Sequence, residues 1–167
     1  MQSASVTPAR PPATRKGQKR AQQRTALLVP LVLVLFVGPA DRPDSLAAAI
    51  RARGASTEEC DITSGPACDL TDDVVWGRIR QIACEGHYAA LFASPNCATF
   101  CAARSNQPGP PVLRTLVHPY GIPASKAREN GLGKAHLEQI RKDNLMAERT
   151  AELAGILQRQ GLPFIIE

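Results

Sequence analysis

Short apolar runs alternate with longer amphipathic segments along this chain from about residue 31 onward. Apolar runs of strand length that stop at turn residues are typical of buried strands. They predict strands at residues 31–37, 55–60, 88–93 and 164–167. Capped segments with apolar residues predict helices at about 47–52 and 73–84. A longer helix, whose apolar residues do not form one stripe, is predicted at about 134–160, between Gly133 and Gly161. The candidate caps are Asp44 or Ser45 for the first helix and Thr71 or Asp72 for the second. This alternation predicts an α/β fold with a parallel sheet.

The first apolar run permits two interpretations. Its valines favour a buried parallel strand at 31–37, so that residues 31–61 form a right-handed strand–helix–strand unit. However, residues 26–37 follow a basic stretch and precede Gly38-Pro39-Ala40, which is the outline of a cleaved secretion signal. The run is too short to span a bilayer, so no membrane attachment is expected. We adopt the strand and keep a secreted, non-enzymatic protein as the alternative.

Charge is concentrated at the start of the chain. Residues 1–26 hold six of the 20 Lys and Arg residues and none of the 15 acidic ones. This composition predicts a basic, disordered tail that can contact nucleic acid or an acidic membrane surface non-specifically. Residues 27–167 are close to neutral and have the length of one ordinary domain. Aromatic residues make up only 4% of the chain, which predicts an aliphatic core.

The cysteines indicate the compartment. Five cysteines, at positions 60, 68, 84, 97 and 101, are too few for a disulfide-stabilised scaffold in a chain of 167 residues. Their odd number also leaves at least one thiol unpaired within the chain. A reducing, intracellular location, nuclear or cytoplasmic, is therefore expected.

One strand end carries a candidate nucleophile. The apolar run at 88–93 stops at Ser94-Pro95-Asn96, and Cys97 follows at once. Catalytic groups of open α/β sheets lie at the carboxyl ends of the strands, which is where Cys97 falls. The alternative is a structural thiol, because free cysteine is among the most buried residue types.

The order of these motifs resembles the catalytic part of cytosine-5 DNA methyltransferases, over residues 31–167. The resemblance implies a partial doubly wound, Rossmann-like sheet that binds S-adenosylmethionine. The family has Phe-x-Gly-x-Gly after its first strand, and Phe36 and Gly38 match this motif, whereas Ala40 replaces the second glycine. A turn of this kind lets backbone amides approach a cofactor, and the phenylalanine packs on the adenine.

The resemblance also assigns two acidic residues to the cofactor. Asp61 follows the second strand, where the family's acid binds the ribose hydroxyls, and Glu59 is the second candidate for this role. Asp69 matches the family's aspartate that binds the adenine amino group. For each acid, the alternative is a helix cap or a solvated loop.

The family's nucleophile motif is Pro-Pro-Cys-Gln, followed by Phe-Ser. Pro95, Cys97 and Phe100 match it, and the second proline and the glutamine are replaced. The resemblance implies that Pro95 borders the cofactor and that the Cys97 thiolate attacks carbon 6 of cytosine, which activates carbon 5 for methylation. Glu167 matches the glutamate that holds the base. The base must leave the DNA duplex to reach such a site.

A long loop at 102–127 corresponds in position to the family's mobile loop beside the nucleophile. Its neighbourhood offers four basic residues for DNA phosphates: Arg104, Arg114, Lys126 and Arg128. The alternative is that each is an ordinary surface charge.

The family has further strands, an Arg-rich motif and a target-recognition region, and none of these matches a segment here. We therefore expect a fragment, a degenerate relative or a subunit that a second chain completes. The last predicted strand then lies at a sheet edge, where unpaired backbone groups invite a partner.

A zinc-binding module is a further alternative. Cys84-x-x-His87 and Cys97-x-x-x-Cys101 offer four ligands with nearly acceptable spacing. Against it, the predicted strand between the two pairs would separate them by about 30 Å if extended. The methyltransferase interpretation therefore assigns no metal.

Overall fold

A four-stranded parallel sheet forms the centre of the protein. The computed structural model describes residues 29–38, 42–95, 98–100 and 109–167, so the predicted basic tail lies outside the described part. The strands lie in the order β2-β1-β3-β4, and all neighbours are parallel. They are β1 (Leu31–Leu35), β2 (Ser56–Cys60), β3 (Ala90–Ala93) and β4 (Phe164–Ile166). The predicted α/β class with a parallel sheet is confirmed.

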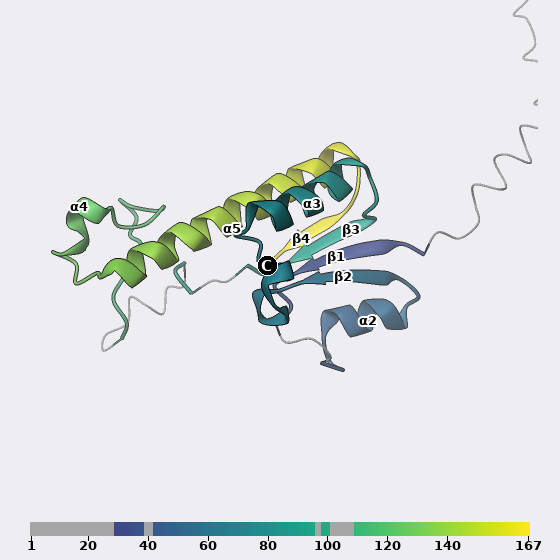
Figure 1. Ribbon diagram of the computed structural model, residues 1–167, viewed down its shortest axis with the longest axis horizontal. Helices are drawn as coiled ribbons and strands as arrows, with labels where there is room; N and C mark the ends of the chain where they lie inside the picture. The colour runs from purple at the N-terminus through teal and green to yellow at the C-terminus, as the bar shows by residue number, and fades with distance from the viewer. Residues whose placement is uncertain (1–28, 39–41, 96–97, 101–108) are drawn as a thin grey trace, which may run out of the picture.

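Helices flank the sheet on both sides (Figure 1). α2 lies beside β2, whereas α3 and α5 pack together on the other side, with α5 against β3 and β4. The helices are α2 (Leu46–Ala52), α3 (Asp73–Cys84), α4 (Ala124–Ala127) and α5 (Lys134–Arg159), and two 3-10 turns, η1 (Ile62–Ser64) and η2 (Pro66–Cys68), follow β2. Of the candidate caps, Ser45 accepts from the N–H of Ala48, and Asp72 accepts from the first turn of α3.

The main core lies between the sheet and the pair α3 and α5. Successive side chains of a strand face opposite sides, so alternate residues of the central strands point toward these helices. Leu33, Leu35 and Leu91 are at most 2% exposed and pack in one cluster with Ile79 and Leu157. Because leucine and isoleucine fill this cluster, the core is largely aliphatic, as the composition predicts.

All four strands are shorter than predicted, β2 and β4 by one residue and β1 and β3 by two. β1 ends before Phe36, whose φ of 62° turns the backbone out of the extended conformation. The N–H of Phe36 still donates to the carbonyl of Cys60 at 2.9 Å, so the turn remains attached to β2. β3 begins two residues after Tyr88, which is buried and donates its hydroxyl proton to Glu58 at 2.7 Å.

The segment before α5 contains a second, smaller core. The sequence predicts a long loop over residues 102–127, and the described part of it, from residue 109, contains no strand and ends with the short helix α4, which was not predicted. Buried apolar residues nevertheless hold this segment against the N-terminal part of α5: Leu113, Ile122, Ala127, Leu132 and Ile140. Figure 1 shows that α4 lies beside this end of α5, away from the sheet. The segment is therefore partly ordered by its own packing.

β4 is an edge strand, as predicted. It pairs with β3 alone among the described strands. Its residues Phe164, Ile165 and Ile166 are 38%, 61% and 45% exposed, although all three are apolar. The other edge strand, β2, carries Glu58 and Glu59 instead, and charged residues discourage edge pairing. The β4 edge is therefore the less protected of the two.

The second core gives a test of packing. Gly121 has a φ of 109°, and a Cβ added there would overlap the side chain of Ile140. We expect Gly121→Ala to lower the free energy of unfolding by about 2–4 kcal/mol, because overpacking and left-handed strain add. Gly77→Ala is the control: Gly77 is an exposed position of α3 with open space around its Cα, so this variant should gain about 0.5–1 kcal/mol. Urea denaturation measures both, and equal effects would contradict the packing described here.

Candidate functional site

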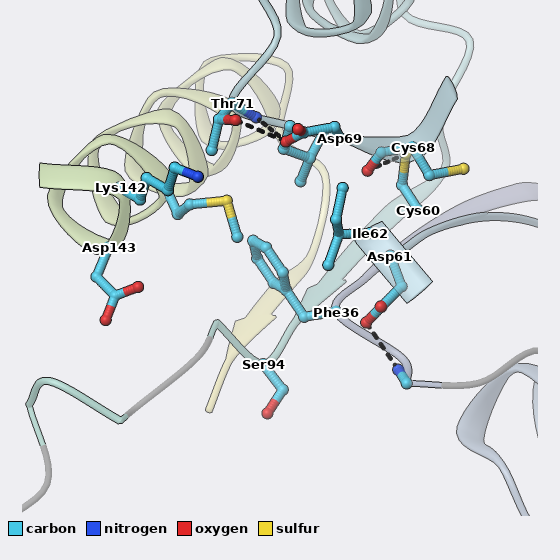
Figure 2. Close-up of a pocket in the computed structure, with 13 residues that line it drawn as sticks. Phe36, Cys60, Asp61, Ile62, Cys68, Asp69, Thr71, Ser94, Lys142 and Asp143 are labelled. Carbon is cyan, nitrogen blue, oxygen red and sulfur yellow. Dashed lines mark hydrogen bonds between the residues drawn. The ribbon is translucent and has the colours of Figure 1, made fainter. Parts of the chain in front are cut away.

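A cavity of about 470 Å³ lies at the carboxyl ends of the strands. Residues that follow β1, β2 and β3 form one side, and the middle of α5 forms the other (Figure 2). The lining residues are Phe36, Gly38, Cys60, Asp61, Ile62, Cys68, Asp69, Leu70, Thr71, Ser94, Lys142, Asp143 and Met146. The carboxyl ends of parallel strands are where open α/β sheets bind their ligands.

The turn after β1 places an aromatic ring in the cavity. Figure 2 shows the ring of Phe36 between Lys142 of α5 and Ile62 of η1. The left-handed conformation of Phe36 is unfavourable for a residue with a side chain, by about 1–3 kcal/mol. Gly38 also has a positive φ, 74°, which glycine adopts without this cost. Strain of this kind often accompanies a functional site.

Asp61 connects the turn after β1 to the turn after β2. Its Oδ2 accepts from the N–H of Gly38 at 2.9 Å, and its Oδ1 accepts from the N–H and the hydroxyl of Thr63 at 2.8 and 2.6 Å. Burial raises the pKa of this carboxyl, but the hydrogen bonds from Thr63 and Gly38 outweigh it and hold the pKa below its usual range. Asp61 is therefore an ionised carboxylate in the cavity wall at neutral pH.

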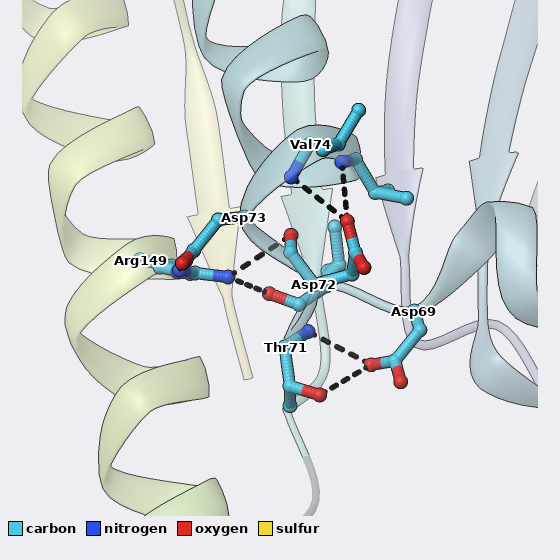
Figure 3. Close-up of polar contacts among 8 residues, drawn as sticks. Asp69, Thr71, Asp72, Asp73, Val74 and Arg149 are labelled. Carbon is cyan, nitrogen blue, oxygen red and sulfur yellow. Dashed lines mark hydrogen bonds and ion pairs between the residues drawn. The ribbon is translucent and has the colours of Figure 1, made fainter.

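Asp69 presents one free carboxylate oxygen. Its Oδ1 accepts from the N–H and the hydroxyl of Thr71, at 2.8 and 2.7 Å (Figure 3). The Thr71 hydroxyl holds the pKa of Asp69 below its usual value, with smaller contributions from Lys142 and Arg149. No described residue donates a hydrogen bond to the Oδ2 of Asp69. A ligand amino group is a suitable donor for this oxygen.

Arg149 of α5 fixes the segment that carries Asp69. It is only 8% exposed, and it donates to the carbonyls of Leu70 and Asp72 and pairs with Asp73 (Figure 3). Its guanidinium also lies over the ring of Trp76. A buried guanidinium that donates to several groups of one segment holds that segment in place, so Arg149 sets the position of this wall. Sequence reasoning missed it, because its partners lie 76 to 79 residues away.

A buried polar contact fixes the segment after the candidate nucleophile. Thr99 is 2% exposed and donates its hydroxyl proton to the Oδ2 of Asp143, at 2.6 Å. Arg114 donates to the same hydroxyl oxygen and stacks on the ring of Phe100, 3.7 Å from its centroid. Thr99 and Asp143 were not predicted, because no local pattern links residues 44 positions apart.

Most of the predicted cofactor residues come together. This cavity is lined by Phe36, Gly38, Asp61 and Asp69. Ser94, the residue before Pro95, lines it too. Pro95 itself is not part of the lining. Glu59, the second candidate for the ribose, faces Arg51 and Thr57 instead and is not among the lining residues.

The predicted catalytic pair is described only in part. Cys97 lies outside the described residues. Glu167 follows β4, and its N–H donates to the carbonyl of Ala93 at 3.0 Å, so it lies at the same carboxyl edge (Figure 1). It is exposed and is not among the residues that line the cavity.

The predicted phosphate contacts differ in availability. Arg114 is only partly exposed, and all three of its guanidinium nitrogens donate within the chain, to Thr99 and to the carbonyl of Pro119. A phosphate would have to replace these hydrogen bonds. Lys126 and Arg128 are exposed on and just after α4, and Arg104 lies outside the described residues.

The metal alternative finds no support in the described part of the chain. Within it, no group of three or more His, Cys, Asp or Glu residues could hold a metal ion. Cys84 is exposed, and His87 lies 3.2 Å from Glu85. Cys97 and Cys101, the other two proposed ligands, lie outside the described residues. Nor is any described helix long and apolar enough to cross a membrane.

The hydrogen bonds of Asp61 predict a pH-dependent stability. Asp61→Asn places an amide N–H against a donor, so we expect it to lower the free energy of unfolding by about 1–3 kcal/mol at pH 7. Because the folded-state pKa is depressed, this contribution is complete above the ordinary value near 4 and is lost as pH falls through the folded-state value. Urea denaturation between pH 7 and pH 2 should therefore show the two proteins converging at acid pH.

Asp44→Asn is the control for this experiment. Asp44 also has a lowered pKa, from its pairing with Arg42, but it is fully exposed, so its loss should leave stability at pH 7 unchanged within error. A constant difference between wild type and Asp61→Asn at all pH values would contradict the ionised state described for Asp61.

Comparisons with known proteins give no relative for this fold or this site. No family model matches the chain, and neither a curated protein nor a solved structure is significantly similar to it. A functional assignment therefore depends on the cavity and its residues.

Proposed function

We propose that the cavity binds S-adenosylmethionine, in a partial doubly wound, Rossmann-like methyltransferase domain. The observation that carries the proposal is the convergence of Phe36, Gly38, Asp61 and Asp69 on one cavity at the carboxyl edge of the sheet. They come from three separate segments of the chain, and all four match the order of motifs in the sequence. Chance placement of four such residues in a single cavity is a weaker explanation.

The chemistry of the cavity suits the parts of this ligand. The Phe36 ring offers a flat apolar surface for adenine, and the free Oδ2 of Asp69 can accept from the adenine amino group. A carboxylate has about four acceptor positions, and Asp61 already uses three, so it can take one ribose hydroxyl directly. Two ionised aspartates disfavour ligands that carry phosphate groups, which distinguishes this cavity from a dinucleotide site.

The proposed reaction is methylation of cytosine carbon 5 in DNA. Bound adenosylmethionine supplies the activated methyl group. The thiolate of Cys97, three residues after the cavity residue Ser94, would add to carbon 6, and carbon 5 would then take the methyl group, with S-adenosylhomocysteine as the leaving group. Loss of the carbon 5 proton would then break the bond between Cys97 and carbon 6. Glu167, at the same edge of the sheet, holds the base in the orientation for attack.

DNA and a second chain are the proposed partners. The target base has to leave the duplex, and the exposed Lys126 and Arg128 are available for phosphate contacts. The exposed edge of β4 is where further strands of a doubly wound sheet would add. The proposed location is intracellular, nuclear or cytoplasmic, where the thiol of Cys97 stays reduced.

Calorimetric titration with adenosylmethionine tests the cofactor assignment. We expect binding by the wild type and at least about tenfold weaker binding by Asp69→Asn, because the asparagine amide presents a donor to the adenine amino group. Glu59→Gln is the control, because it makes the same carboxylate-to-amide change at a residue of β2 that is not among the cavity-lining residues. Absence of binding by the wild type, or equal loss in both variants, would refute the assignment.

Covalent trapping tests the nucleophile. DNA that contains 5-fluorocytosine retains the enzyme, because the fluorine at carbon 5 cannot leave as a proton does. We expect a trapped complex with the wild type plus adenosylmethionine, and none with Cys97→Ser, since the serine hydroxyl is not ionised at neutral pH. Cys84→Ser is the control, because Cys84 is an exposed free thiol on α3. Equal trapping by the wild type and by Cys97→Ser would overturn the proposed role of Cys97.

A further inference from the structure

Two free thiols lie next to each other in the wall of the cavity. Cys60 is the last residue of β2, and Cys68 is the last residue of η2. The Sγ of Cys60 lies 3.8 Å from the carbonyl oxygen of Cys68 (Figure 2). The Sγ of Cys68 lies 3.8 Å from the carbonyl oxygen of Glu59. Each sulfur therefore reaches the backbone of the other thiol's segment, which brings the two side chains together.

The two thiols differ in their exposure to solvent. Cys60 is only 1% exposed, and its burial, with the neighbouring Cys68, raises the pKa of its thiol to about 12. Cys68 is partly exposed and is among the residues that line the cavity. The thiolate is the attacking species in disulfide exchange, so Cys68 is the thiol that a dissolved reagent meets first.

We propose that Cys60 and Cys68 form a reversible dithiol–disulfide site that reacts with small-molecule disulfides of the glutathione type. The Cys68 thiolate attacks one sulfur of the reagent, whose S–S bond breaks and releases one small thiol. Cys60 then loses its proton and attacks the Cys68 sulfur, which forms the Cys60–Cys68 bond and releases the second small thiol. Two protein thiols are oxidised, and one small disulfide is reduced to two thiols.

Because the two cysteines lie in the cavity wall, their oxidation changes that wall. The segment between the two cysteines carries Asp61 and η1, and both border the cavity. An S–S bond of about 2.05 Å draws the end of η2 toward the end of β2 and fixes this wall. The oxidised and reduced proteins therefore present different cavities. This inference depends on the two thiols alone and holds whichever ligand the cavity binds.

Mass spectrometry of the full-length chain tests the pair. A Cys97→Ser/Cys101→Ser variant is equilibrated in glutathione buffers from reducing to oxidising, alkylated, and cleaved before aspartate. This cleavage separates peptide 44–60 from peptide 61–68, so an intramolecular bond appears as one linked species. The exposed Cys84 remains in this variant and reports, by its own mixed disulfide with glutathione, that the buffer oxidises accessible thiols.

Single substitutions test the order of the two steps. In the same background, Cys60→Ala should leave glutathione attached to Cys68, because the second thiol is missing. Cys68→Ala should leave Cys60 reduced, because Cys60 is buried. Linked peptides that form reversibly, in buffers no more oxidising than those that modify Cys84, support the proposal. Two free thiols at Cys60 and Cys68, or a persistent mixed disulfide at Cys68, in buffers that modify Cys84 would overturn it, and neither result involves adenosylmethionine or DNA.

Discussion

Parallel pairing on both sides of β1 determines where the cavity lies. Leu35 is in register with Cys60 of β2 and with Ala93 of β3, so these three strands end at the same level. The turns that follow them then meet at one edge of the sheet, although they are far apart in the sequence. If either neighbour ran antiparallel, its carboxyl end would lie at the opposite edge, and the cavity would lose one wall.

Long-range polar contacts hold those turns in place. The bond from Gly38 to Asp61 joins the turns after β1 and β2, and Arg149 attaches the segment before α3 to α5. The contact between Thr99 and Asp143 does the same for the segment after β3. Each involves a side chain that is at most 9% exposed, where a hydrogen bond to a charged group is stronger than in water. Sequence patterns identify Asp61 among these side chains, but they do not identify Arg149, Thr99 or Asp143.

The sequence predicted what depends on local periodicity and capping. The strand of β1, the cap at Asp72 and the bounds of α3 follow from patterns within a dozen residues, and the structure confirms them. α4 and its small core were missed, because Ile122 and Ile140 become neighbours only after α5 forms. Among the site residues, Phe36 and Asp61 could be predicted because each follows a strand directly. Arg149 and Asp143 could not, because nothing in a helix sequence indicates which distant backbone a buried side chain meets.

For the two aspartates of the cavity, a structural role as a cap or turn and a role in ligand binding are compatible. Asp61 caps η1 and Asp69 forms a turn with Thr71, so the structural alternative is correct for both. The same hydrogen bonds depress the pKa of each carboxyl and fix its orientation. A carboxylate that is already ionised and oriented loses little conformational entropy when a ligand hydroxyl or amino group arrives. Local capping therefore orients both carboxylates before any ligand arrives and leaves the Oδ2 of Asp69 without a hydrogen bond from a described residue.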